Sequence, residues 1–165
     1  MNNVGVVGGN KKFIDFLENL FYMTKTDCHI TTEKRIECKK YYDFIIFNHS
    51  SHKAELSLDC SYILINMDSF KECKAAIRGD VITYGFGSKN TITLSSIESE
   101  TGKLVYCIQR YINKNPMFIL QPQELPLVMN FDDDELLYAL MAGLTIVMLE
   151  CDDYGKIKIK LNERK

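Results

Sequence analysis

The sequence predicts an α/β protein built on a mostly parallel sheet with helices on both faces, and three observations support that prediction. A short apolar run at residues 3–7 ends in Gly8 and Gly9, and apolar side chains at helical spacing follow. Continuous apolar runs at residues 43–48 and 61–66 are typical of strands that are covered on both faces. Together these features indicate a three-layer sandwich.

The chain is expected to form one domain. It has 165 residues, of which 46% are hydrophobic, enough for one well-packed domain but too few for two. Within residues 1–165 we expect an α/β part at 1–90, an antiparallel meander at 91–131, and a packing helix with a tail at 132–165. The remaining elements expected in the α/β part are a helix from about residue 13, strands at residues 27–31 and 80–84, and a short helix at residues 69–77 with Ser69 as its N-cap.

Alternating apolar and polar residues predict the meander. They occur at residues 91–98, 104–112 and 118–131, with turn-forming segments between them. The three aspartates at 132–134 then precede a long apolar segment that ends near Glu150. Acidic residues stabilise the positive end of a helix, so we predict a buried helix there. Lysine and isoleucine alternate at 156–161, which favours an edge strand.

Composition excludes several functions. The formal charge of −2 argues against a general nucleic-acid surface, which needs clustered excess Lys and Arg. The six cysteines form no C-x-x-C pair, so a zinc site is not expected. No apolar stretch approaches the ~20 residues that span a bilayer, and no signal peptide is recognised. We therefore expect a cytoplasmic protein with reduced thiols and no membrane contact.

The segment at residues 6–13, V-V-G-G-N-K-K-F, is similar to a phosphate-binding loop. In such a loop, glycines let backbone N–H groups approach the phosphates, a lysine reaches the terminal phosphates, and a Ser or Thr hydroxyl binds Mg²⁺. The candidate phosphate or nucleotide contacts are Gly8, Gly9, Asn10, Lys11 and Lys12. However, Phe13 occupies the hydroxyl position, and a phenyl ring cannot bind a hard cation. The loop is therefore expected to be vestigial, with an anion as its natural ligand.

Five segments in order resemble the central, ATP-binding domain of the Mur ligases, which add amino acids to the peptidoglycan precursor. The first is the segment at residues 6–13, where the family has V-T-G-T-N-G-K-T. The others are F-I-I-F-N-H-S-S-H at 44–52, N-M-D-S at 66–69, V-I-T-Y-G at 81–85 and Y-A-L-M-A at 138–142. They are similar to the family's E-V-S-S-H, N-x-D-D, V-I-T-Y-G and N-A-L-A-A. The resemblance spans the chain and implies a P-loop-like sandwich from a bacterial, cytoplasmic protein.

The resemblance also identifies altered site positions. Asn48 stands where the family has a glutamate that helps to hold magnesium, and Tyr138 replaces an asparagine beside the nucleotide. The family's substrate and amino-acid domains have no counterpart in these residues. Amide ligation through an acyl phosphate needs ATP, Mg²⁺ and two bound substrates. Independent ligase activity is therefore not expected.

Other chemical interpretations are weaker. Ser50 and Ser51 lie beside His49 and His52, but neighbouring residues at a strand end point in opposite directions, and no G-x-S-x-G elbow is present. The N-terminal glycines lack the third glycine of a dinucleotide fingerprint, so a tight turn explains them better. Helix capping explains the aspartates at 132–134 more simply than calcium binding does.

Two function classes remain open. The first is a non-catalytic Mur-ligase-like module with no resident cofactor, which acts through an unidentified protein partner or weak anion binding; a homo-oligomer is also open. The second is an ATP-dependent ligase-type enzyme or subunit in cell-wall peptide synthesis, in which Lys12 contacts the phosphates. In that case Ser50, His52 or Asp68 would supply replacement contacts to Mg²⁺.

Overall fold

The computed structural model describes residues 1–37, 40–49, 57–71, 76–115 and 118–151. Its strands are β1 (Asn2–Val7), β2 (Cys28–Thr32), β3 (Tyr41–Phe47), β4 (Ser57–Asn66), β5 (Ala76–Tyr84), β6 (Ile92–Glu98), β7 (Lys103–Ile108), β8 (Ile112–Asn115), β9 (Phe118–Leu120) and β10 (Gln123–Val128). Its helices are α1 (Lys11–Thr24), the short 3-10 helix η1 (Glu33–Arg35) and α2 (Asp134–Glu150).

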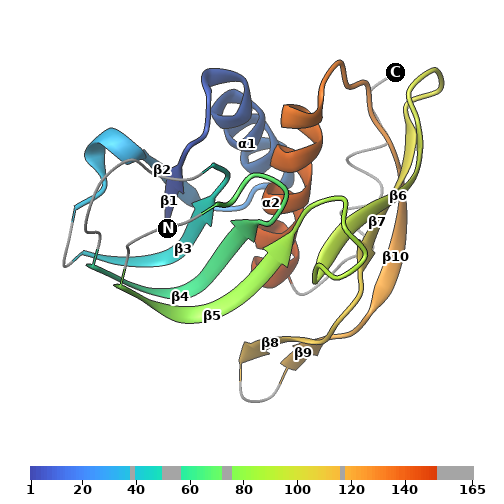
Figure 1. The fold of residues 1–165 in the computed structure, drawn as a ribbon. Coiled ribbons are helices and arrows are strands. Elements are labelled where there is room, and N and C mark those ends of the chain that lie inside the picture. The colour runs from blue at the N-terminus through green and yellow to red at the C-terminus, as the bar shows by residue number, and fades with distance from the viewer. Residues whose placement is uncertain (38–39, 50–56, 72–75, 116–117, 152–165) are drawn as a thin grey trace.

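Eight strands form one sheet in the order β10-β7-β6-β5-β4-β3-β1-β2 (Figure 1). The pairs from β2 to β6 are parallel, and the pairs β6–β7 and β7–β10 are antiparallel. The predicted α/β class with a mostly parallel sheet is therefore confirmed. The predicted strands of the α/β part, the strand at 91–98 and the long helices after the glycine turn and after the aspartates are also present, with boundaries that differ by a few residues. The predicted stretch at 104–112 is β7 followed by the start of β8, and the stretch at 118–131 contains both β9 and β10.

Both α-helices lie on the same face of the sheet, where they contact each other (Figure 1). The larger apolar core joins them to inward-facing residues of the strands, such as Val6, Phe44 and Leu64. A Cβ atom on Gly143 would lie 2.7 Å from Leu17 Cδ2, so α2 approaches the leucines of α1 closely at this glycine. Sequence periodicity identified both helices but not the face that each one covers.

The opposite face of the sheet carries a second, smaller core. It contains Val7, Ile45 and Phe47, and Ile36 after η1 and Phe70 after β4 pack there. The described residues place no α-helix on this face, so the three-layer sandwich is not confirmed. Strands here are buried by irregular segments, which produce the same continuous apolar runs as helices would.

The antiparallel meander is joined to the main sheet. Tyr84 of β5 pairs with Ile92 of β6, which links β6, β7 and β10 to the parallel strands. Only the β8–β9 hairpin forms a separate two-stranded sheet in the described residues. Alternating residues reveal that a segment is a strand, but they do not reveal which edge it joins.

The prediction of a short helix at 69–77 is wrong for its first and last residues, which the structure describes. Ser69 lies in a turn after β4, and Ala76 and Ile77 already belong to β5. Residues 72–75 and the predicted tail strand at 156–161 lie outside the described residues. Among the described residues, no helix combines the length and apolar character needed to cross a membrane.

Candidate functional site

The glycine turn lies where the sheet reverses its strand order. The chain passes from β1 to β2 on one side and returns to β3 on the other, so the carboxyl ends of β1 and β3 are neighbours. Ligands of open parallel sheets bind at such a reversal. Gly8 has a φ of +72°, and a Cβ there would lie 2.7 Å from the backbone N of His49. The turn therefore requires glycine both for its conformation and for the close approach of β3.

A side chain of the turn itself caps the N-terminus of α1. Asn10 is the N-cap, and its Oδ1 accepts a hydrogen bond of 2.9 Å from the backbone N–H of Phe13. The ring of Phe13 is fully buried in the core between the sheet and the helices. The ring therefore points into the core. The residue still offers no oxygen to a metal.

Lys12 is paired with two carboxylates from the start of α2. Its Nζ lies 2.7 Å from Asp132 Oδ1 and 2.6 Å from Asp133 Oδ2. Hydrogen bonds to these aspartates raise the pKa of Lys12, and the bond from Lys12 is the main cause of the lowered pKa of Asp133. Asp133 also caps α2, since its Oδ1 accepts from Leu136 N–H at 3.1 Å. The lysine that would contact a phosphate is thus neutralised within the chain.

A third carboxylate reaches the turn from the other side. The backbone N–H of Gly8 donates to Oε2 of Glu33, at the start of η1, over 3.3 Å. An N–H of this kind is what a phosphate-binding turn offers to its ligand. Carboxylates from η1 and α2 therefore contact two of the groups that an anion would use.

Asn48, at the end of β3, is the centre of a buried polar network. Its Nδ2 donates to Glu135 Oε1 at 2.8 Å, and its Oδ1 accepts from Asn66 Nδ2 at 3.0 Å and from Tyr84 OH at 3.1 Å. Asn48 and Asn66 are fully buried, and burial raises the pKa of Tyr84. The Asn48 side chain is consequently held as a connector between β3, β4, β5 and α2.

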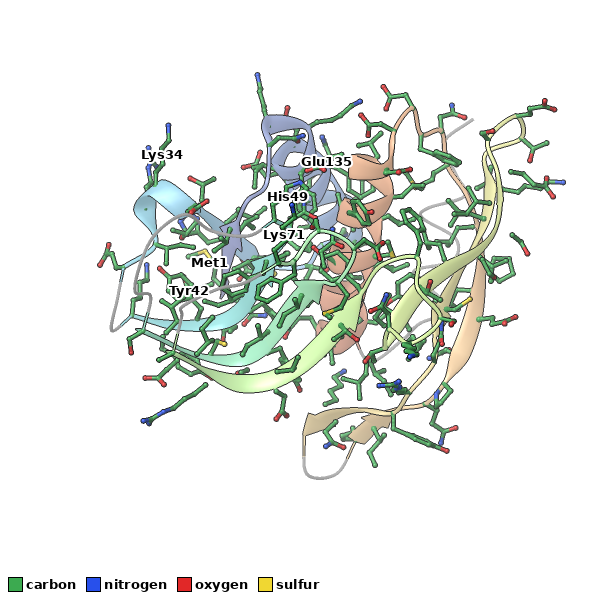
Figure 2. All side chains as sticks on the ribbon, viewed as in Figure 1. Met1, Lys34, Tyr42, His49, Lys71 and Glu135 are labelled. Carbon is green, nitrogen blue, oxygen red and sulfur yellow. The ribbon has the colours of Figure 1, made fainter. Side chains whose placement is uncertain are left out.

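Glu135 also faces His49. The distance from His49 Nε2 to Glu135 Oε2 is 3.4 Å, and Figure 2 shows the two residues beside each other near the N-terminal end of α2. The Glu135 side chain is 13% exposed, whereas that of His49 is 47% exposed. The site thus has a solvent-facing imidazole above a nearly buried carboxylate.

Asp68 and Tyr138 meet at the end of the site near β5. The Tyr138 hydroxyl donates to Asp68 Oδ2 at 3.2 Å, and the same oxygen accepts from Phe86 N–H at 2.7 Å. Desolvation and the Asp68 charge raise the pKa of Tyr138. A Cβ on Gly85 would lie 2.8 Å from the Asp68 carboxylate. Asp68 is thus occupied in holding α2 against the loop after β5.

The structure brings most of the predicted positions to this end of the sheet. Lys12 is held by the two aspartates that precede α2, Asn48 is held by Glu135 of α2, Tyr138 is held by Asp68, and Lys11 remains exposed. Ser50 and His52 lie outside the described residues. In the described part of the chain, no three His, Cys, Asp or Glu side chains are grouped as metal ligands.

The sequence alone does not predict the contacts that four acidic residues make at the site. Helix capping accounts for the aspartates at 132–134 without any partner, and nothing in the sequence marks Glu33 or Glu135. An acidic run before an apolar helix was the available signal, but it does not specify the partner. The cysteines give no sign of reactivity where pKa shifts are resolved, because burial raises the pKa of Cys28 and Cys60 to about 12.

Comparison with models of known protein families gave no match, and comparison with curated proteins gave none.

Proposed function

We propose that this chain is a non-catalytic module of Mur-ligase-like descent, whose vestigial phosphate turn is closed by its own acidic residues and which acts through a protein partner. The observation that carries the proposal is the double engagement of α2. Asp132 and the N-cap Asp133, which lead directly into α2, bind Lys12, and Glu135 in its first turn binds Asn48. One helix end therefore occupies both positions that the family resemblance assigns to Mg²⁺-ATP.

The residues present do not fit Mg²⁺-ATP. A triphosphate over the turn would have to displace Asp132 and Asp133 from Lys12, and it would meet their charges at close range. Asn48 cannot turn to a metal without leaving Glu135, Asn66 and Tyr84 without their hydrogen bonds. Leaving buried polar groups unpaired is costly.

The second candidate, an ATP-using ligase-type enzyme or subunit, is favoured by two observations. Gly8 retains the left-handed conformation of a tight turn at the order reversal, and the Lys12 side chain is 41% exposed. An anion could therefore approach this lysine if the aspartates moved away.

Calorimetric titration with ATP, with and without Mg²⁺, separates the two candidates. We expect weak binding at most and no tightening by Mg²⁺. Inorganic phosphate is the matching simpler probe: Asp132→Asn with Asp133→Asn should strengthen its binding about tenfold, since two repelling charges are removed. Lys12→Ala should abolish phosphate binding in both backgrounds, and Lys25→Ala, at an exposed lysine after α1, is the matched control.

Micromolar, Mg²⁺-dependent ATP binding by the unaltered chain, or Mg²⁺-dependent ATP hydrolysis alone or with a co-purifying protein, would contradict the proposal. Restoring the family residues by Phe13→Thr and Asn48→Glu should not create an ATP site. The first change empties part of the core, and the second places a carboxylate beside Glu135. If this double variant stays folded and binds Mg²⁺-ATP tightly, the closure by α2 is not the deciding feature.

A further inference from the structure

One edge of β5 has no strand beside it over most of its length. β5 pairs with β4 from Ala76 to Tyr84, but it pairs with β6 only at Tyr84. Within the described part of the chain, residues 76–82 of β5 therefore have a strand partner on the β4 side alone. The backbone N–H and C=O groups on the other side form a template for another strand.

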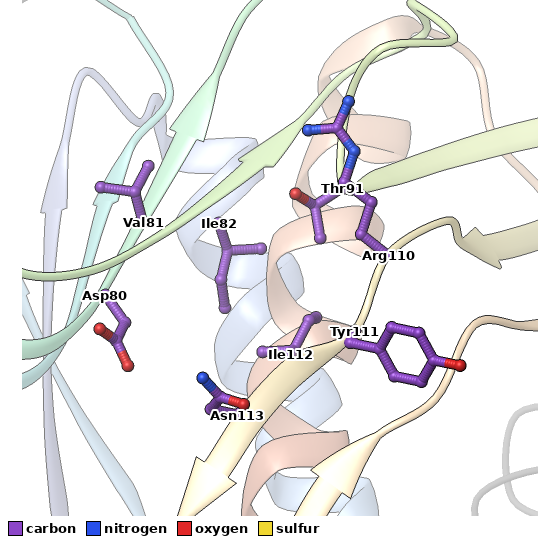
Figure 3. Close-up of a pocket in the computed structure, with 8 residues that line it drawn as sticks. All are labelled: Asp80, Val81, Ile82, Thr91, Arg110, Tyr111, Ile112 and Asn113. Carbon is purple, nitrogen blue, oxygen red and sulfur yellow. The ribbon is translucent and has the colours of Figure 1, made fainter.

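This edge borders a groove of about 330 Å³. Figure 3 shows residues 80–82 of β5 on one side and, on the other, residues 110–113, which lead from the end of β7 into β8. None of the residues that line the groove belongs to the glycine turn or to the contacts of Lys12 and Asn48.

Apolar side chains are exposed along both walls. Val81 on β5 is 57% exposed and Tyr111 on the opposite wall is 70% exposed, while Ile82 and Ile112 are buried and contribute to the lining. Apolar residues gathered beside an open strand edge are typical of an interaction surface.

The charges of the groove are of opposite sign on its two walls. Asp80 belongs to β5 and Arg110 to the opposite wall, and among the described residues neither takes part in an ion pair. A strand bound between them can present a basic side chain to Asp80 and an acidic side chain to Arg110. This arrangement gives the occupant a preferred charge pattern.

We propose that this groove binds an extended segment of a partner protein, which adds to the sheet as a strand beside β5. Main-chain hydrogen bonds to the β5 edge supply affinity, and pockets for alternate side chains supply specificity, as in β-strand addition generally. The bound segment alternates apolar and polar residues and carries an acidic residue opposite Arg110.

A single extended segment fits this groove better than the edge of a second copy of the chain. The residues from Arg110 to Asn113 stand opposite β5 and limit the width of what can enter. A second copy would bring its own opposite wall and β8–β9 hairpin into the same space. A lone strand has no such obstruction.

Strand binding by this groove names the kind of partner that the proposed function requires, and it rests on the proposed function only for the idea that the chain acts through a partner. Experiments can contradict either proposal without contradicting the other. Mg²⁺-dependent ATP turnover would overturn the proposed function and leave the groove unchanged, whereas failure of strand binding leaves the closed glycine turn unchanged.

The first test is selection of displayed random peptides on the full chain, followed by fluorescence anisotropy with the synthesised winners. We expect alternating sequences with an acidic residue. N-methylation of the peptide backbone should weaken binding about tenfold at every second position and have little effect at the positions between, because only alternate N–H groups face β5. Arg110→Glu should weaken acidic peptides, whereas Lys103→Glu on β7 is a matched charge reversal outside the groove.

The second test is amide hydrogen exchange of residues 76–82. In the full chain alone, alternate amides of this segment should exchange rapidly, and the selected peptide should protect them. Protection of these amides without any peptide would overturn the proposal, because the edge of β5 would already be covered. The oligomeric state in solution would then show whether a second copy or the chain's own residues cover it. Equal binding by the wild type and Arg110→Glu, or N-methyl effects without a period of two, would overturn it as well.

Discussion

The carboxyl ends of the parallel strands and the open edge of β5 offer opposite situations. At the strand ends, Lys12, Asn48 and Asp68 all have partners within the chain. At the edge of β5, residues 76–82 have a strand partner on one side only within the described part of the chain, and Val81 and Tyr111 are exposed. The first region has the sequence of a binding site but is closed, and the second has no recognisable motif but is open.

A binding motif in the sequence therefore does not show that its groups are accessible to a ligand, and an accessible surface can lack any motif. A phosphate turn binds its ligand through groups that are free before the ligand arrives. Here the N-terminal residues of α2 hold the groups of the turn and tie α2 to β3 and β5, so we expect changes there to affect folding. Changes in the groove should affect binding and leave folding nearly unaltered.

The largest expected effect is that of Asn48→Ala. Removing the amide leaves Glu135, Asn66 and Tyr84 without a shared partner in a buried place, which should lower the free energy of unfolding by about 3 kcal/mol. Asn19→Ala is the control, because the Asn19 side chain is exposed and bonds only within α1. Urea denaturation measures both. Equal, small changes would show that the network at the strand ends contributes little.

Gly8→Ala should have the next largest effect on the free energy of unfolding. The substitution forces a side chain into the left-handed region and against the backbone of His49, and it should cost about 2 kcal/mol of unfolding free energy. Gly87→Ala should change it by about 0.5 kcal/mol or less, since a Cβ there has its nearest neighbour, Asn90 Nδ2, at 3.4 Å. Thermal or urea unfolding of the pair provides the measurement. A tolerant Gly8 would mean that the close contact of β1 with β3 can relax.

The ion pair between Lys12 and Asp133 should make a small, pH-dependent contribution. The pKa of Asp133 is lowered below its ordinary value of 3.8, so its contribution is present above that pH and is lost as the pH falls through the lowered pKa. Asp133→Asn retains a good N-cap and removes the charge. The stability difference between wild type and variant should therefore be visible at neutral pH, shrink in acid, and shrink with added salt. A difference that persists in acid would indicate a role other than charge.

The smallest expected effect lies in the groove. Val81→Ser and Arg110→Ala should each change the free energy of unfolding by about 0.5 kcal/mol or less, because neither side chain supports the core. Urea denaturation checks this, with Ile82→Ser, at the buried neighbour, as the contrasting variant. If Val81→Ser destabilises the chain as much as Ile82→Ser, the outer face of β5 is part of the folding core.

The sequence predicted the α/β class well because buried strands and helices contain recognisable patterns of apolar residues. The apolar runs at 43–48 and 61–66 became β3 and β4, and the long apolar segment after the aspartates became α2. The predicted helix at 69–77 was wrong where it can be seen, since a short stretch contains too few periods to separate a helix from the start of a strand. The relationship to the Mur ligases and the absence of turnover stay predictions.

The amino-acid sequence by itself determined the local elements and the absence of a hydroxyl at position 13, because propensity, periodicity and side-chain chemistry are properties of short segments. Only the tertiary structure decided that Asp132 and Asp133 pair with Lys12, that Glu135 bonds Asn48, and that one edge of β5 has no strand beside it among the described residues. These contacts join residues far apart in the chain. Which residues meet depends on how α2 packs on the sheet and on where β6 diverges from β5. Neither arrangement follows from the sequence of a single segment.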